Sequence, residues 1–300
     1  MASPESRTMR PQRQPLTQNL PPLSLEEERR LWEEEALKNP LPSGILVEPL
    51  EDGALVGERI QPTSGFSGTI LYLHGGGFSQ GSSKTHRHLA ALLALHTGWQ
   101  VLTLDYPLAP EHPFPQAIDF TVEAYQQLLV TGHPPSQVCF AGDSAGGQIA
   151  LSALLKARDE GLRIPAGAFF ISPWLDLTLS GETMLSLAEL DPLVTRDGLQ
   201  KAADVYLQDH DPQDDMASPL FASLSGLPPM LCLVGEHEVL LSDSLTLADQ
   251  ASEAAVQCLI KTYPEMWHVW PAWGEGLPEA VQAFKDVQAF LESVCLEDGC

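Results

Sequence analysis

The sequence predicts an α/β protein whose central sheet is mostly parallel and is covered by helices on both faces. Short apolar or β-branched runs alternate with helix-length stretches over most of the 300 residues. The runs are 69–74, 100–105, 137–142, 166–171, 230–235 and 256–263, and the helical stretches lie near 84–97, 115–131, 145–160, 243–255 and 277–293. This alternation is typical of a parallel sheet that is buried on both sides.

The first 45 residues are expected to lie outside this alternation. Residues 1–23 are rich in Pro and Gln, contain no apolar signal-peptide segment and are predicted to form a disordered arm. Ser24 and Glu27 fit a capping box, so an amphipathic helix is expected within residues 24–45 as part of a cap. The turn residues "EDG" between the two apolar runs that follow predict a hairpin.

Charge and cysteine content argue against several classes of protein. There are 40 acidic residues against 16 Lys and Arg, which gives a formal net charge of −24. Such a surface repels phosphate groups, so nucleic acids and anionic membranes are not expected partners. No apolar run is long enough to span a membrane. Five scattered cysteines without metal-ligand spacing favour a cytoplasmic location and no metal site.

A candidate nucleophile follows the run 137–142. The segment "CFAGDSAGGQIA" contains the pattern G-x-S-x-G from Gly142 to Gly146, with Ser144 at its centre. A serine on so sharp a strand-to-helix turn holds its hydroxyl clear of the sheet, and the helix N-terminus behind it supplies free N–H groups. Asp143 is expected to support this turn.

The segment "LYLHGGGF" places three glycines directly after a predicted strand. Glycine there costs backbone entropy and adds nothing to a core, so the bare backbone needs another reason. Acyl transfer from an ester develops negative charge on the carbonyl oxygen, which N–H donors must already face. We expect the amides of Gly76, Gly77 and Ala145 to form this oxyanion hole, and His74 and Gly75 to hold the shape of the loop.

These two motifs resemble those of the bacterial hormone-sensitive lipase family of carboxylesterases, which has the α/β-hydrolase fold. The resemblance covers about residues 45–295 and includes "DYPLAPEHPFP" (105–115), "SPWLDLT" (172–178) and "VGEHEVLLSDS" (234–244). It implies a hydrolase domain over residues 46–300 that carries a cap insertion at about 175–225. One departure is Pro107, where the family usually has Arg, so the bracing of that loop is an open question.

The resemblance also implies a catalytic triad in the order serine, acid, histidine. Its members are Ser144, then Glu238 three residues after Gly235, then His268 in "MWHVW". The family acid is most often Asp, but Glu can still orient an imidazole. Asp243 is the alternative acid. The remaining histidines that we weighed against His268 are expected to have surface or bracing roles: His86, His88, His112 and His237.

The predicted function is that of a serine carboxylesterase acting on short- to medium-chain acyl esters. His268 would take the Ser144 proton, Glu238 would hold the imidazole, and the glycine amides would bind the oxyanion, with no cofactor or metal. The expected partner is a small ester, and the resemblance implies a homodimer. The alternatives are an amidase or deacetylase acting on small acylated amines, and a non-catalytic ligand-binding member of the fold.

Overall fold

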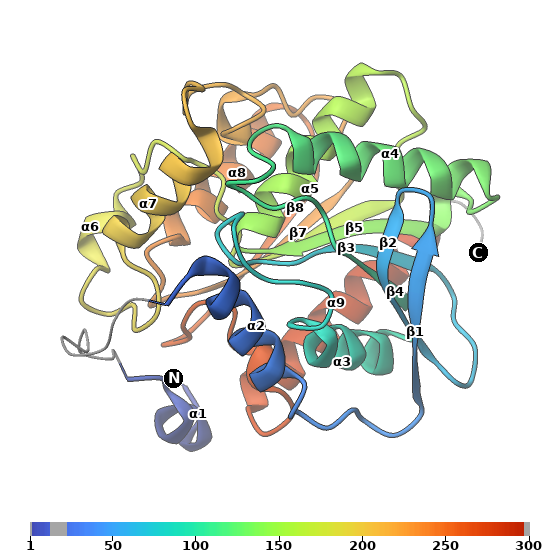
Figure 1. The fold of residues 1–300 in the computed structure, drawn as a ribbon, viewed down its shortest axis with the longest axis horizontal. Coiled ribbons are helices and arrows are strands. Elements are labelled where there is room, and N and C mark those ends of the chain that lie inside the picture. The colour runs from blue at the N-terminus through green and yellow to red at the C-terminus, as the bar shows by residue number, and fades with distance from the viewer. Residues whose placement is uncertain (1, 13–22, 297–300) are drawn as a thin grey trace.

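A computed structural model describes residues 2–12 and 23–296, and these form one sheet with helices packed on both of its faces (Figure 1). The sheet has eight strands in the order β1-β2-β4-β3-β5-β6-β7-β8. Among the described residues, β2 pairs antiparallel with β1 and β4, and the other neighbouring pairs are parallel. The strands are β1 (Ile45–Asp52), β2 (Leu55–Pro62), β3 (Thr69–Leu73), β4 (Gln100–Leu104), β5 (Val138–Asp143), β6 (Gly167–Ile171), β7 (Met230–Gly235) and β8 (Cys258–Tyr263). The predicted α/β architecture is confirmed.

The burial of the strands explains why their sequences are so uniformly apolar. Every residue of β3, β4, β5, β6 and β7 is buried, because helices cover the sheet on both sides. The strand β8 is at the edge of the sheet and is mostly half-buried or exposed. The predicted hairpin is also confirmed, since Asp52 of β1 faces Leu55 of β2 across the "EDG" turn.

The predicted helices are present and divide into two layers. α3 (Arg87–Thr97) and α9 (Pro278–Leu296) share one hydrophobic core with one face of the sheet. The other face packs in a second core against α4 (Gln116–Val130), α5 (Ala145–Asp159) and α8 (Leu241–Glu253). In Figure 1 the labels α3 and α9 lie below the sheet, and α4 and α5 lie above it. None of the described helices is both long and apolar enough to cross a membrane.

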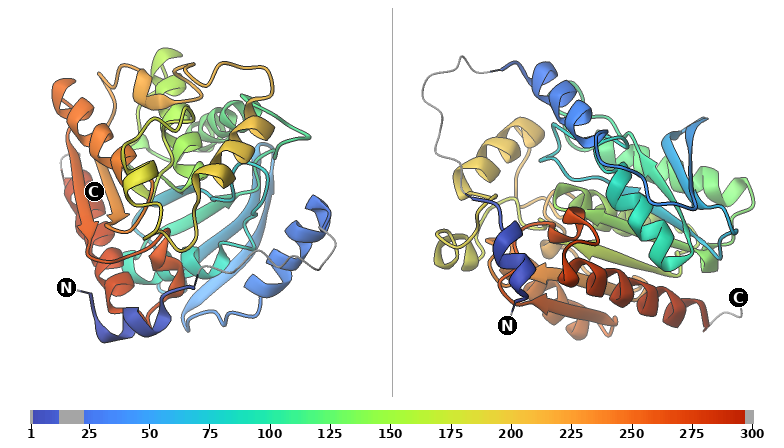
Figure 2. Two further views of the ribbon diagram at one scale, coloured as in Figure 1. Left: turned by 90° about the vertical axis from the view of Figure 1, so that its left-hand side faces the viewer. Right: turned by 90° about the horizontal axis from the view of Figure 1, so that it is seen from below.

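The N-terminal segment differs from the predicted disordered arm. Residues Pro4–Met9 form the helix α1, with Ser3 as its N-cap and Pro4 in its first turn. Ser3 donates from its backbone N–H and its hydroxyl to the Glu279 carboxylate at 2.6 and 2.9 Å, and so docks α1 against the start of α9 (Figure 2). For residues 2–12 the predicted disorder is wrong, because the stabilising partner is 276 residues away in the sequence. Residues 13–22 of the predicted arm lie outside the described residues.

Two further segments lie at the side of the sheet where the candidate site is found. The first is α2 (Leu25–Ala36), which begins with the predicted capping box between Ser24 and Glu27 and buries none of its residues. The second, within residues 175–225, carries α6 (Thr183–Ser186), α7 (Arg196–Leu207) and the 3₁₀ turn Pro219–Phe221. Side chains of α2 and α7 line the same cavity.

Candidate active site

The candidate residues lie after the carboxyl ends of neighbouring strands. Gly75 follows β3, Ser144 follows β5, Glu238 follows β7 and His268 follows β8. Parallel strands end at the same edge of a sheet, so these loops meet. They border a cavity of about 850 Å³ whose lining includes Gly75, Gly76, Gly77, Asp143, Ser144 and His268.

Ser144 lies on a strained turn between β5 and α5. Its φ is +53° and its ψ is −124°, a conformation that is costly for a residue with a side chain. The surrounding backbone holds it there, because its N–H donates to Ile171 O at 3.1 Å and its carbonyl accepts from Gly147 and Trp174, each at 3.0 Å. A Cβ at Gly146 would lie 2.0 Å from the carbonyl oxygen of Leu73, so only glycine fits there.

Glu238 and His268 form a direct contact. The His268 ring donates from Nδ1 to Glu238 Oε2 at 2.9 Å. The other carboxylate oxygen, Oε1, accepts from the Gly235 N–H at 2.6 Å and from the Ser172 hydroxyl at 2.8 Å. These bonds fix a fully buried carboxylate in one orientation. The imidazole is thereby held in the tautomer that leaves Nε2 free of the ring proton.

The charge of Glu238 also changes the basicity of the imidazole. Burial alone would lower the pKa of His268, but the hydrogen bond and the negative charge of Glu238 outweigh it and raise the pKa above its ordinary value. Asp191 and Asp143 contribute in the same direction. The site therefore favours an imidazolium, which is the form that a general base adopts after it has taken a proton.

The alternative acid, Asp243, is placed elsewhere. Its Oδ2 accepts from the backbone N–H groups of Leu175 and Asp176 at 2.8 and 3.1 Å. Burial raises the pKa of Asp243 to about 7. Asp243 therefore braces the start of the 175–225 segment, and the structure places Glu238 rather than Asp243 against His268.

The glycine loop has a backbone conformation that favours glycine. Gly76 has a φ of +125° and Gly77 a φ of +59°. A Cβ at Gly76 would lie 2.2 Å from the carbonyl oxygen of Gln80. Gly76 and Gly77 line the cavity together with Ser144, and Ala145, the third predicted donor, is the first residue of α5. The structure thus brings Gly76 and Gly77 to the cavity that Ser144 lines, and Ala145 directly follows the serine.

Asp143 connects the serine turn to the glycine loop. Its Oδ1 accepts from the Tyr72 hydroxyl at 2.8 Å and from the Gly75 N–H at 3.0 Å, and its Oδ2 lies 3.4 Å from His86 Nε2. Burial would raise the pKa of Asp143, but His86 and Tyr72 together lower it. The carboxylate is therefore charged and holds the first glycine of the loop in place.

His74 supports the same loop from inside the core. Its Nδ1 donates to the carbonyl of Gly75 at 2.8 Å, and its ring stacks on Tyr106 with the centroids 4.2 Å apart. Burial, followed by the nearby His86, lowers the pKa of His74 to about 3. A ring that stays neutral at physiological pH suits a bracing role.

The competing histidines have other partners. His237 accepts from Arg10 Nη1 at 2.7 Å, His112 contacts Gln116, and His88 contacts the carbonyl of Pro40. His86 is buried beside Asp143, closer to the serine turn than its sequence context indicates. Ser172 opens the segment "SPWLDLT", but no role was predicted for it; its hydroxyl bridges Glu238 and the Val269 N–H.

The fold and the arrangement of these groups define the class of the protein. A serine on a strained strand-to-helix turn, a carboxylate-bound imidazole and a bare glycine loop around one cavity are characteristic of the hydrolases of the α/β-hydrolase fold. Within residues 2–12 and 23–296, no three His, Cys, Asp or Glu side chains are grouped as a metal site.

Comparisons with known proteins identify the family. A family model described as alpha/beta hydrolase fold matches residues 70–272. An esterase of Acinetobacter venetianus is 39% identical over 254 residues, 84% of each chain, and an acetyl-hydrolase of Streptomyces hygroscopicus is 40% identical over 241 residues, 80% of this chain and 81% of the relative. The crystal structure of an esterase from the bacterial hormone-sensitive lipase family superposes with a TM-score of 0.88 at 38% identity, covering 92% of this chain and 94% of that one. The chain belongs to this family of carboxylic ester hydrolases.

Proposed function

We propose that the protein hydrolyses short- to medium-chain acyl esters through an acyl-enzyme on Ser144. The observation that carries this proposal is the 2.9 Å contact between Glu238 and His268 beside the cavity that Ser144 also lines. The names of the relatives, an esterase and an acetyl-hydrolase, agree with it. A further similar structure, at 38% identity and a TM-score of 0.87 over 93% of this chain and 95% of that one, is the esterase EstE5 soaked with p-nitrophenyl butyrate.

The reaction would proceed in two half-reactions at one serine. His268 Nε2 takes the hydroxyl proton as Ser144 Oγ attacks the ester carbonyl, and Glu238 stabilises the imidazolium that forms. The amides of Gly76, Gly77 and Ala145 bind the oxyanion of the tetrahedral intermediate. The imidazolium then protonates the departing alcohol. Water, deprotonated by His268, attacks the acyl-enzyme; the bond from the acyl carbon to Ser144 Oγ breaks, the carboxylic acid leaves, and His268 returns the proton to Ser144 Oγ.

The walls of the cavity support a preference for short and medium acyl chains. Trp32 of α2 and Leu199 and Ala202 of α7 also line it. We assign residues 24–45 and 175–225 to a cap over a hydrolase domain of residues 46–300. A cavity of about 850 Å³ that is partly closed by such a cap can hold a small ester, whereas a long triacylglycerol chain would have to leave it.

A series of p-nitrophenyl esters tests the proposal. We expect hydrolysis of the acetate, butyrate and octanoate and far slower hydrolysis of the palmitate. Ser144→Ala should lower kcat by at least about 10³-fold. Equal turnover by Ser144→Ala would contradict the acyl-enzyme. Faster cleavage of the matching p-nitroanilide than of the ester would favour the amidase alternative, and absence of turnover on both would favour the binding protein.

The homodimer and the cytoplasmic location also remain proposals. The strand β8 is an edge of the sheet, and its Leu259 side chain is 40% exposed, which suits pairing with a second copy. Light scattering on the purified chain would test this pairing. Cys139 and Cys232 are free thiols in the core, which agrees with a reducing compartment.

A further inference from the structure

Arg29 is one of the residues that fix α2 to the catalytic edge of the sheet. Its Nε donates to the carbonyl of Ser79 at 2.7 Å, and its Nη2 donates to the carbonyl of Ala109 at 2.8 Å. The same guanidinium binds both carboxylate oxygens of Glu111 at 2.8 and 2.9 Å. One planar group therefore joins a helix that walls the cavity to two separate loops. Its side chain is only 24% exposed, against 54% for Glu111.

The contact with Ser79 leads to the glycine loop in one step. The Ser79–Gln80 peptide has its carbonyl on Arg29, and its N–H donates to the carbonyl of Gly76 at 3.0 Å. The N–H of Ser79 also donates to Gly76 O, at 3.3 Å. Because a trans peptide is planar, its carbonyl and N–H point in opposite directions. Fixing the carbonyl of Gly76 therefore fixes the direction of the Gly77 N–H, one of the proposed oxyanion donors.

The contact with Ala109 gives Arg29 a second link to the glycine loop, through Phe78. The N–H of Ala109 donates to the carbonyl of Phe78 at 2.9 Å, while its own carbonyl accepts from Arg29. Ala109 belongs to the loop in which Pro107 replaces the arginine usual in the family. The bracing that the sequence left open is therefore supplied here by an arginine of α2.

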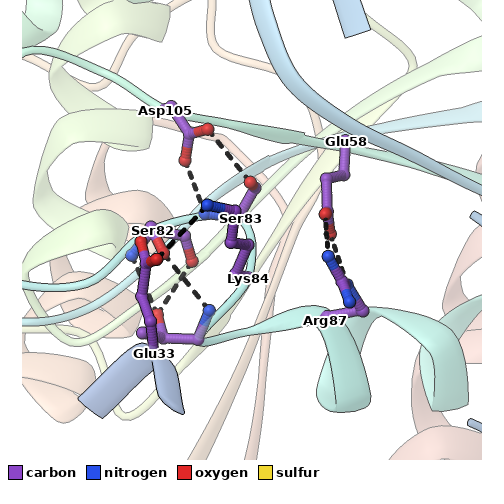
Figure 3. Close-up of polar contacts among 8 residues, drawn as sticks. Glu33, Glu58, Ser82, Ser83, Lys84, Arg87 and Asp105 are labelled. Carbon is purple, nitrogen blue, oxygen red and sulfur yellow. Dashed lines mark hydrogen bonds and ion pairs between the residues drawn. The ribbon is translucent and has the colours of Figure 1, made fainter. Parts of the chain in front are cut away.

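Two more exposed contacts join α2 to the segment that follows the glycines. Gln80 donates to Glu28 of α2 at 2.7 Å, and Lys84 reaches Glu33 at 3.3 Å. Figure 3 shows the Lys84–Glu33 pair beside Ser83, whose N–H and hydroxyl bind the Asp105 carboxylate at 2.6 and 3.0 Å. The bonds of Ser83 and Lys84 secure the segment after the glycine loop. The Gln80–Glu28 bond also reaches the turn, because the Gln80 N–H donates to Gly76 O.

We propose that Arg29 is a positioning residue for the oxyanion hole, and that it acts through the Ser79–Gln80 peptide on the amide of Gly77. This inference rests on the proposed function, which assigns the Gly77 amide to the oxyanion hole. The planar guanidinium of Arg29 can donate to two carbonyls and a carboxylate at once. The ammonium group of a lysine, on its flexible side chain, cannot reproduce this geometry. A docked α2 thus both walls the cavity and aligns the hole.

Kinetics of Arg29→Gln and Arg29→Lys on p-nitrophenyl butyrate test this role. We expect kcat to fall by about 10-fold or more in Arg29→Gln, since a displaced donor stabilises the transition state less, with KM changed by less than about 2-fold. Arg29→Lys should be intermediate. Arg30→Gln is the matched control, because Arg30 is the next residue of α2 and pairs with Glu34 where both side chains are exposed. Glu111→Gln removes the exposed carboxylate charge and should change kcat by less than about 3-fold.

Inhibitor binding separates positioning from a general loss of structure. In Arg29→Gln, affinity for an alkyl boronic acid, which mimics the tetrahedral intermediate, should fall by the same factor as kcat. Affinity for the product butyrate should not change. The proposal would be overturned if the kcat of Arg29→Gln equalled that of Arg30→Gln. It would also be overturned if Arg29→Gln lost affinity for the boronate and for butyrate by the same factor. If Arg29→Gln does not fold, Arg29→Lys and Arg30→Lys give the same comparison. The proposed function is tested separately: it stands if the wild type hydrolyses the ester and Ser144→Ala does not, whatever the Arg29 variants do.

Discussion

Glu238 and Asp243 are both buried acidic residues, five positions apart, yet their surroundings give them different roles. Each needs partners, because an unpaired buried charge is costly. Glu238 is bound by one titratable group, the His268 ring, and by two donors that orient it. Asp243 is bound by two backbone N–H groups, which cannot take up a charge. Of the two, only Glu238 therefore lies where it can stabilise the His268 imidazolium.

The substitution Glu238→Gln tests this difference at the imidazole. Loss of the negative charge removes the effect that raises the pKa of His268, so the acid limb of the kcat/KM profile should shift to lower pH. The limb of the wild type should lie above the ordinary histidine pKa of 6.5. We also expect kcat to fall by about 10³- to 10⁴-fold, because the amide no longer selects the tautomer. An unshifted limb would contradict the assignment.

The substitution Asp243→Asn should act on stability rather than on catalysis. The folded pKa of Asp243 is about 7 and its ordinary value is 3.8, so between these values the native state binds more protons than the unfolded one. This contribution to the free energy of unfolding is complete below pH 3.8 and is lost as the pH rises towards 7, at up to about 1.4 kcal/mol per pH unit. Urea unfolding across this range should show the slope in the wild type and a smaller one in Asp243→Asn. The variant's kcat should stay close to that of the wild type.

At the scale of elements, the turn from β5 to α5 depends on the close approach of β3. The Gly146 backbone lies against the carbonyl oxygens of Leu73 and His74, which leaves no space for a methyl group. The strained φ of Ser144 is maintained because the backbone on both sides of it is hydrogen-bonded into the sheet and the helix. The position of the hydroxyl thus depends on strand packing and not on the serine alone.

The substitution Gly146→Ala should therefore move the turn. Both carbonyls belong to backbone that cannot rotate away, so we expect a loss of several kcal/mol in the free energy of unfolding and a strongly reduced kcat. The matched control is Gly276→Ala, where the new Cβ would meet only Met9 at an ordinary 3.7 Å. Thermal melts and ester kinetics of both variants check this expectation. Wild-type behaviour of Gly146→Ala would show that the strands can separate locally.

Local patterns predicted the elements and most candidate residues, but they did not predict contacts made across the fold. The strand and helix ranges follow from apolar periodicity, and the motifs around Ser144 and Gly76 indicate their backbone directly. Helix α1 has no such pattern and depends on the distant Glu279. The contacts of Ser172 and Arg29 depend in the same way on loops that meet only in the folded chain.

At the scale of the whole molecule, the acidic composition adds a repulsion that no single contact shows. With a net charge of −24, compacting the chain brings like charges together. Salt shortens the range of this repulsion, from a Debye length of about 30 Å at 0.01 M to about 3 Å at 1 M. The same charge should hasten the departure of a carboxylate product from the cavity.

We therefore expect the thermal midpoint of unfolding to rise when sodium chloride is increased from low concentration to about 0.5 M. Potassium chloride should give the same rise at equal ionic strength, because screening does not depend on the cation. Differential scanning calorimetry measures both. A midpoint that falls with salt would mean that attractive ion pairs, such as the one between Arg87 and Glu58, outweigh the net repulsion.

Mass spectrometry of the wild-type enzyme treated with a fluorophosphonate tests the central claim most directly. This reagent phosphonylates a serine only where a base removes its proton and donors hold the phosphoryl oxygen. The account predicts one adduct per chain on the peptide that contains Ser144, formed far more slowly in His268→Asn. An adduct on another residue, or continued ester hydrolysis by fully Ser144-labelled protein, would contradict it.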